Sequence, residues 1–202
     1  MIAYEEGRSP VNKDSEGRMH FKIVFWGPTL SGKTTALRWI YDNIEGLAKG
    51  GFTSVEDPTG RTLYFDYTPL SASGKVIFDV FTVAGQKRHR HQRRIVIQGT
   101  DGIIFVADSL VSQLNENTES LSELKQMLGS NLNSDIPLVV MLNKRDEPGA
   151  ADRKALIDSL GLRDVPIFET IATKGTGVRR AFQAIAREVL LKRLYKGSLP
   201  TV

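Results

Sequence analysis

The feature that most constrains the fold is a glycine-rich segment at residues 27–34, with the sequence GPTLSGKT. It follows an apolar, β-branched run at 20–26 and precedes apolar residues at helical spacing over 33–45. The segment matches G-x-x-x-x-G-K-[ST] in the strand-to-helix setting that this motif requires. In that setting, backbone N–H groups and the positive end of the helix dipole form an anion site. We therefore predict a phosphate-binding loop.

Side chains of this loop have distinct predicted roles. Lys33 would reach the β- and γ-phosphates of a nucleotide, and the Thr34 hydroxyl would ligate Mg²⁺. Lys33 is also a predicted catalytic residue. The predicted nucleotide contacts in and beside the loop are Gly27, Thr29, Leu30, Ser31, Gly32, Lys33, Thr34 and Thr35.

The rest of the chain alternates short apolar runs with helical patterns. Strands are expected at 61–67, 75–83, 102–107, 137–142 and 166–169, and helices near 111–128, 150–160 and 177–195. This alternation predicts an α/β fold with a central, mostly parallel six-stranded sheet flanked by helices. Together with the phosphate-binding loop, it is typical of a P-loop NTPase. One domain would span 19–196, between an N-terminal tail (1–18) and a C-terminal tail (197–202). Ligands of such sheets bind at the carboxyl ends of the strands.

A second motif indicates which base is bound. Asn143, Lys144 and Asp146 follow the predicted strand 137–142 and match the N-K-x-D element of GTPases. The Asp146 carboxylate can accept hydrogen bonds from guanine N1–H and the 2-amino group, which adenine cannot offer. Sites built on such bonds reject the wrong analogue by about 10⁴-fold. The aliphatic stem of Lys144 can cover one face of the ring. We predict GTP or GDP as the ligand.

Two further segments lie where a γ-phosphate sensor is expected. Thr62, between the first helix and the second strand, is the predicted ligand of Mg²⁺ and γ-phosphate. Gly85, just after the third strand, would offer its N–H to the γ-phosphate, and Gln86 would orient the attacking water. Loss of these contacts after hydrolysis would release both loops.

Taken together, these motifs resemble those of Ras-superfamily small GTPases, with details similar to the prokaryotic MglA-type branch. The marks are GPxLxGKT at 27–34, GRTLYFDYTPL at 60–70 and TVAGQ at 82–86. An Arf-like GTPase is the alternative. It is favoured by Ala172 and Thr173, which lie where small GTPases bind the guanine carbonyl through the alanine N–H. It is weakened by Ile2, because that branch carries a myristoylated glycine at this position.

The resemblance implies a molecular switch that binds GTP or GDP with Mg²⁺ and hydrolyses GTP to GDP and phosphate. It also implies that Arg61 is an arginine finger supplied in cis and that the GTPase-activating protein is of the roadblock type. A guanidinium near the transferring phosphoryl group stabilises transition-state charge. Effectors are expected to bind the switch regions, from Gly60 to Asp66 and from Gly85 to Arg94.

Two residues depart from the usual pattern. Thr82 stands where most small GTPases place an aspartate near Mg²⁺, and Asp66 on the adjacent strand is the predicted substitute. Thr29 occupies a loop position that is often glycine, where a side chain crowds Gln86 and an arginine finger. Hydrolysis is therefore expected to be slow without an activating partner. The alternative is a nucleotide-locked scaffold with negligible hydrolysis.

Composition bears on membrane attachment, on cellular location and on the role of the basic stretch. Without cysteine, and with Ile2 in place of glycine, no lipid anchor is expected. No apolar run reaches the roughly 18 residues of a transmembrane helix, so we expect a cytoplasmic protein. The basic stretch 87–94 is either a solvated surface or a contact for an acidic partner. Nucleic acid is a less favoured ligand for this stretch, because no aromatic residues interleave the charges.

Overall fold

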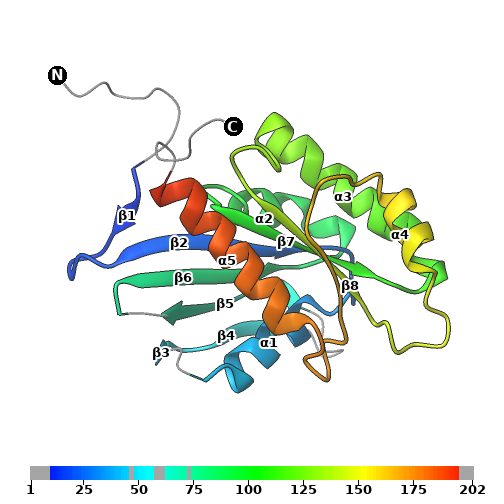
Figure 1. Cartoon of the computed structure of the whole chain (residues 1–202), viewed down its shortest axis with the longest axis horizontal. Coiled ribbons are helices and arrows are strands. Elements are labelled where there is room, and N and C mark those ends of the chain that lie inside the picture. Colours follow the sequence, from blue (N-terminus) through cyan, green and yellow to red (C-terminus); the bar gives the residue numbers. More distant parts are fainter. Residues whose placement is uncertain (1–9, 46–47, 57–61, 72–73, 196–202) are drawn as a thin grey trace.

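The fold is a central β-sheet between two layers of helices (Figure 1). The computed structural model describes residues 10–45, 48–56, 62–71 and 74–195. In this part of the chain the strands are β1 (Asn12–Lys13), β2 (Met19–Trp26), β3 (Ala48–Lys49), β4 (Thr53–Glu56), β5 (Thr62–Ser71), β6 (Val76–Val83), β7 (Gly102–Asp108), β8 (Leu138–Asn143) and β9 (Ile167–Glu169). The helices are α1 (Lys33–Asn43), α2 (Arg90–Val96), α3 (Leu114–Leu128), α4 (Arg153–Leu160) and α5 (Val178–Leu194).

The sheet is mostly parallel. Its strand order is β3-β5-β6-β2-β7-β8-β9, with β1 paired to β2 and β4 paired to β5. Strand β2 lies between β6 and β7 and is parallel to both, and β8 and β9 continue in the same direction. Strand β5 is antiparallel to β6. The carboxyl ends of β2, β6, β7, β8 and β9 therefore meet at one edge of the sheet.

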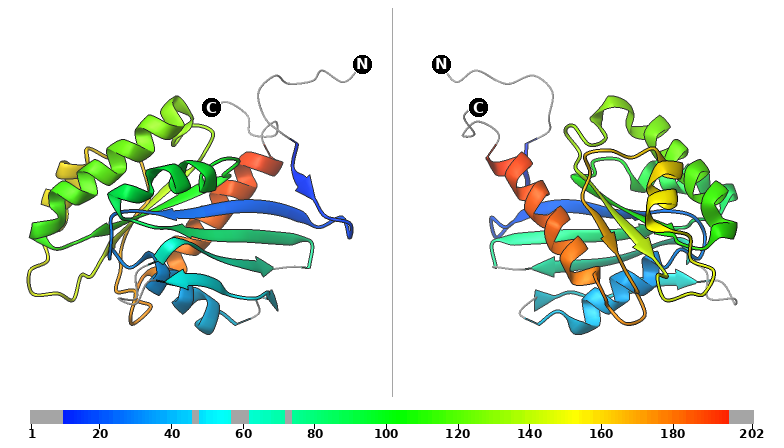
Figure 2. Two further views of the ribbon diagram at one scale, coloured as in Figure 1. Left: turned by 180° about the vertical axis from the view of Figure 1, so that it is seen from behind. Right: turned by 45° about the vertical axis from the view of Figure 1, so that its right-hand side comes forward.

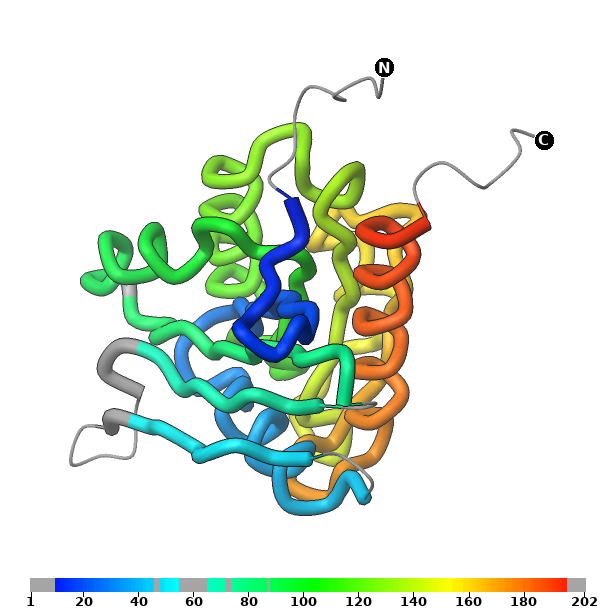
Figure 3. The backbone as a smooth tube through the Cα atoms, turned by 90° about the vertical axis from the view of Figure 1, so that its left-hand side faces the viewer, coloured from blue at the N-terminus to red at the C-terminus, as the bar shows by residue number. Residues whose placement is uncertain are grey.

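Burial on both faces explains why the central strands are continuous apolar runs. Helices α1 and α5 cover one face, and α2, α3 and α4 cover the other (Figures 2 and 3). Side chains of β2 alternate between the two cores, with Phe21, Ile23 and Phe25 packed beneath α1 and α5. Val24 and Trp26 enter the opposite core. All five side chains are fully buried.

The structure confirms the predicted α/β sheet and adds to it. Among the residues that the structure describes, the sheet has nine strands rather than six, because β1, β3 and β4 are short segments without an apolar alternation. Helix α2 lies in the basic stretch and was not predicted. The strand predicted over 61–67 continues to Ser71, and the first residues of the helix predicted over 111–128 form a 3-10 turn (Val111–Gln113). None of the helices in the described ranges has the length and apolar character needed to span a membrane.

Residues 10–18, which the sequence places in a tail, include β1 and a turn closed by Asp14. The Asp14 carboxylate accepts hydrogen bonds from the backbone N–H groups of Glu16 and Arg18. It also binds the Arg18 side chain, which holds the pKa of Asp14 well below its usual range. This turn brings Asp14 to the side chain of His20 on β2.

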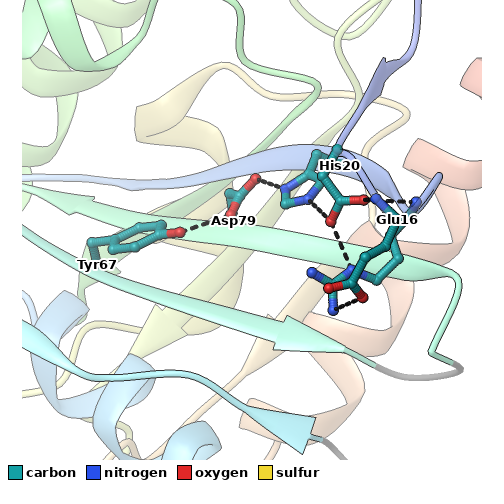
Figure 4. A network of polar contacts seen from close by, with 6 residues as sticks. Glu16, His20, Tyr67 and Asp79 are labelled. Carbon is teal, nitrogen blue, oxygen red and sulfur yellow. Dashed lines mark hydrogen bonds and ion pairs between the residues drawn. The ribbon is translucent and has the colours of Figure 1, made fainter.

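His20 joins this N-terminal turn to the sheet (Figure 4). Its Nδ1 lies 2.7 Å from Asp79 Oδ2 on β6, and its Nε2 lies 3.2 Å from Asp14 Oδ2. Burial opposes protonation of His20, but the hydrogen bonds with Asp79 and Asp14 outweigh it and raise the pKa. The Tyr67 hydroxyl donates to Asp79 at 2.9 Å, and burial together with that carboxylate raises the pKa of Tyr67 to about 12. His20 therefore bridges two carboxylates that favour its protonated form.

This bridge predicts a pH-dependent contribution to stability. Because the pKa of His20 is higher in the folded state, its contribution is complete below the unfolded pKa and is lost as pH rises through the folded pKa. As pH rises above the ordinary pKa of histidine and through the raised folded-state pKa, the difference in unfolding free energy between the wild type and His20→Gln should shrink. Urea titrations at each pH measure that difference.

The control is the same substitution made in an Asp14→Asn, Asp79→Asn background, where no carboxylate remains to hold the imidazolium. There the pH trend should disappear. A difference that stays constant with pH in the wild-type background would contradict the charged bridge.

Candidate functional site

The glycine-rich loop connects β2 to α1 at the carboxyl edge of the sheet. A Cβ atom at Gly27 would lie 2.2 Å from the Val106 carbonyl oxygen of β7, and one at Gly32 would lie 2.2 Å from Asn143 Nδ2. Both glycines also have positive φ, at 151° and 98°. The backbone is thus packed directly against β7 and β8, and only glycine fits at these two positions.

Lys33 lies under this loop. Its ammonium donates to the carbonyl oxygens of Gly27 at 3.0 Å and Pro28 at 2.6 Å, and the residue is only 6% exposed. Burial, reinforced by the charges of Arg93 and Lys144 and opposed by Asp66, lowers the pKa of Lys33 to about 7. A polyphosphate beside Lys33 would favour its charged form. The predicted phosphate-binding lysine is therefore at the loop, in a setting that an anion would stabilise.

The Thr34 hydroxyl points to a buried carboxylate on another strand. It donates to Asp66 Oδ2 at 2.5 Å, and Thr82 Oγ1 donates to the same oxygen at 2.5 Å. Ser54 donates to Asp66 Oδ1 at 2.6 Å. Asp66 and Thr82 are direct partners in the β5–β6 register, so the two side chains share one face of the sheet. Asp66 thus occupies the region where the sequence lacks an aspartate at Thr82.

These groups suit Mg²⁺ bound through a nucleotide. Within the described residues, no group of three or more His, Cys, Asp or Glu side chains could hold a metal by itself. Mg²⁺ in phosphate-transfer sites is held by few protein ligands together with phosphate oxygens and water. The Thr34 hydroxyl with the Asp66 carboxylate behind it fits that pattern, so the residues present are compatible with the ion.

Asn143 joins the phosphate loop to the segment that follows β9. Its Nδ2 donates to the Ser31 carbonyl at 2.8 Å, and its Oδ1 accepts from Ala172 N at 2.9 Å and Thr170 Oγ1 at 3.1 Å. The sequence suggested that the Ala172 N–H meets guanine, but in the structure it is donated to Asn143. A buried backbone donor requires a partner, and Asn143 provides one. Asn143 therefore organises the site through protein contacts.

The remaining N-K-x-D residues lie at the open end of this site. Lys144 has a positive φ of 65°, and its ammonium lies 2.5 Å from Asp108 Oδ2 at the end of β7. The Asp146 carboxylate lies 3.1 Å from the Lys174 ammonium, and its side chain keeps 32% of its exposure. The acceptor predicted for guanine is thus accessible, with a cation beside it. Asp108 was missed by the sequence analysis, although it directly ends a buried central strand.

The segment after β6 packs against the phosphate loop. A Cβ atom at Gly85 would lie 2.4 Å from the Thr29 backbone nitrogen, so no larger residue fits there. Gln86 follows, and its Nε2 is buried with no hydrogen-bond partner within the described ranges. Gly85, the predicted γ-phosphate sensor, therefore packs on the phosphate loop, and Gln86 is the next residue along the chain.

The basic stretch is not uniformly a solvated surface. Arg88, Arg90, His91 and Arg94 are exposed, but His89 and Arg93 are buried. Arg93 donates to the carbonyl oxygens of Ala84 and Gln86 and pairs with Glu123 of α3. Neither Arg93 nor Glu123 was singled out from the sequence, because a run of arginines does not reveal which one turns inward.

The other predicted contacts vary in exposure. Thr29 is half-buried, Ser31 is buried, and Leu30, Thr35 and Thr173 are exposed. Gly60 and Arg61 lie outside the described residues. The backbone of Thr62 begins β5, but its side chain lies outside the described part of the structure. The first switch region is thus described only from its strand onward.

Comparison with known proteins assigns this site to a family. Residues 9–189 match the ADP-ribosylation factor family. The chain is 38% identical over 190 residues to the mutual gliding-motility protein MglA of Myxococcus xanthus, an alignment that covers 91% of this chain and 96% of that protein. It also resembles the solved small GTPase Arl6 (BBS3) of Trypanosoma brucei, which carries the nucleotide analogue GppNp. That match has a TM-score of 0.65 and 25% identity, covering 86% of this chain and 99% of the other.

The Arf-like alternative is compatible with these matches and fits no better than the MglA-type reading. The phosphate loop, the N-K-x-D element and the matched length agree with one conclusion. The chain belongs to the ADP-ribosylation factor family within the Ras superfamily and is a small GTPase of the MglA type, a guanine-nucleotide-binding switch that hydrolyses GTP.

Proposed function

We propose that this GTPase is a Mg²⁺-dependent switch whose own residues hydrolyse GTP slowly until a partner completes the site. The observation that carries the proposal is the hydrogen-bonded array of Thr34, Asp66 and Thr82 next to the phosphate loop. Mg²⁺, when bound, would neutralise charge on the β- and γ-phosphate oxygens. Guanine nucleotides are intracellular, and the cytoplasm is the compartment that we propose for the protein.

Each part of the site has a proposed task. Lys33 and the backbone N–H groups of the loop hold the phosphates, and Asp66 orients the Thr34 hydroxyl toward the metal. Asp146 accepts from guanine, while Asn143 keeps the phosphate loop and the 170–175 segment in register. Thr62 would complete the metal and γ-phosphate contacts when switch I is ordered.

Hydrolysis needs an oriented water and stabilisation of developing charge. Gln86 is proposed for the first task, and its buried Nε2, which has no hydrogen-bond partner among the described residues, supports this role. Arg61 is proposed for the second. Thr29 crowds this region, since Gly85 packs on its backbone. That crowding supports slow hydrolysis in the absence of an activating protein, for which a roadblock-type partner is our proposal.

Asp146→Asn tests the proposed base site. The substitution should weaken GDP and GTP binding and improve xanthine nucleotides, because xanthine has a carbonyl where guanine has the 2-amino group. Competition binding with GDP, XDP and ADP measures the preference. The exposed Asp158→Asn on α4 is the matched control and should leave the preference for guanine intact. If Asp146→Asn binds GDP, XDP and ADP in the same order of affinity as the wild type, Asp146 is not the guanine-binding residue.

Asp66→Asn tests the proposed metal support. Residues that orient a metal ligand typically contribute about 10- to 100-fold to metal affinity. The Mg²⁺ concentration needed for slow GDP release should therefore rise by about 10-fold or more. Asp79→Asn on the neighbouring strand removes a similar carboxylate away from the loop and should leave the Mg²⁺ requirement unchanged. Equal Mg²⁺ dependence in both variants would rule out the role of Asp66.

Arg61→Ala tests the proposed arginine finger. With saturating activator, single-turnover GTP hydrolysis should fall by at least about 10²-fold, because arginine fingers contribute about 10³- to 10⁵-fold. GTP affinity should hardly change. Arg61→Lys should rescue little, since a point charge cannot replace a planar guanidinium. The exposed Arg180→Ala on α5 is the control. A loss of less than about threefold would mean that the finger comes from the partner or from an arginine of switch II.

A further inference from the structure

Arg93 differs from the other arginines of the basic stretch because its guanidinium is buried. It is 4% exposed, whereas Arg88, Arg90 and Arg94 face solvent. A buried guanidinium is costly unless its donors are paired with acceptors. The acceptors that satisfy Arg93 therefore indicate what the residue does.

These acceptors come from two separate parts of the fold. Nη1 of Arg93 donates to the carbonyl oxygens of Ala84 at 2.9 Å and Gln86 at 2.6 Å. Nη2 and Nε donate to the Glu123 carboxylate on α3, with Nη2 lying 2.9 Å and 2.8 Å from its two oxygens. The two carbonyls flank Gly85. One side chain thus links the γ-phosphate-sensing segment to helix α3.

The end of β2 reinforces this link. The Arg93 guanidinium lies 5.7 Å from the centre of the Trp26 ring, and Trp26 Nε1 donates to the Ser120 carbonyl of α3 at 2.9 Å. Trp26 is the residue immediately before the phosphate loop. Arg93 is therefore held on one side by Glu123 and on another by an aromatic ring that is itself tied to α3.

An open pocket of about 510 Å³ lies beside Gly85, and Pro28, Arg93 and Glu123 also line it. On the opposite side, Gly85 is pressed against Thr29. The two hydrogen bonds from Arg93 tie the backbone on either side of Gly85 to helix α2, beside this pocket.

We propose that Arg93 is a positioning residue for GTP hydrolysis. Fixed by Glu123, it holds the backbone of the Ala84–Gln86 segment and thereby aims the Gln86 amide at the phosphate site. This inference rests on the proposed role of Gln86 in orienting water. Small displacements of a catalytic group reduce rates strongly, with about 1 Å costing on the order of 10²-fold.

The test compares four variants with the wild type: Arg93→Met, Glu123→Gln, the charge swap Arg93→Glu/Glu123→Arg, and Gln86→Leu. Single-turnover hydrolysis should fall by about 10-fold or more in Arg93→Met, while GDP affinity changes by less than about threefold. Glu123→Gln keeps the shape of its side chain and should give a smaller loss in the same direction. Arg179→Met, on the exposed face of α5, is the matched control and should hydrolyse GTP at the wild-type rate.

The charge swap distinguishes the effect of the hydrogen bonds from Arg93 to Ala84 and Gln86 from the effect of the ion pair between positions 93 and 123. It restores an ion pair between α2 and α3, so thermal stability should recover relative to Arg93→Met. A glutamate at position 93 has no N–H to donate to Ala84 and Gln86, so hydrolysis should stay low. In the GDP complex, the backbone amide NMR signals of Gly85 and Gln86 should shift in Arg93→Met and in the swap, and stay in place in Arg179→Met.

Recovery of both stability and hydrolysis in the swap would overturn the positioning role, as would unshifted amide signals. Wild-type hydrolysis in Gln86→Leu would instead refute the role of Gln86, and with it this inference. Loss of hydrolysis in Gln86→Leu together with wild-type rates in Arg93→Met and Glu123→Gln would refute the inference about Arg93 alone.

Discussion

The site depends on a buried side-chain amide at the carboxyl edge of the sheet. Asn143 is 2% exposed and uses both ends of its amide, donating to Ser31 of the phosphate loop and accepting from Thr170 and Ala172. Leaving a buried polar group without its partner costs about 1–3 kcal/mol. The phosphate loop and the base-binding segment are therefore held together by the same residue.

A second constraint is the position of the buried negative charge. Most small GTPases are expected to carry it on the strand that contains Thr82, but here the carboxylate comes from Asp66 on the neighbouring strand. The antiparallel register places these two residues opposite each other, so their side chains share one face. The Asp66 carboxylate therefore lies beside Thr34, although it comes from β5 and not from β6, the strand that contains Thr82.

The basic stretch combines two kinds of arginine. Several of its charges face solvent, whereas Arg93 turns inward to satisfy backbone carbonyls and Glu123. A single short helix thus carries both exposed charges and a buried arginine that contacts the residues beside the phosphate loop. An exposed arginine, Arg94, and a buried one, Arg93, are thus adjacent in the basic stretch.

The sequence by itself determined the sheet, the phosphate loop and the guanine-binding motif, because each depends on a local pattern. Apolar runs define strands buried on both faces, and the glycine spacing at 27–34 permits only one kind of turn. The sequence also suggested that Asp66 replaces the aspartate missing at Thr82, and the structure brings Asp66 to Thr34. The tertiary structure alone decided that Asn143 meets Ser31 and Ala172 and that Arg93 meets Glu123. It also decided that β1, β3 and β4 join the sheet, since such short polar segments are stabilised by their neighbours. Spacing along the chain records local periodicity, whereas the pairing of buried polar groups depends on strand order and register, which bring together residues far apart in the sequence.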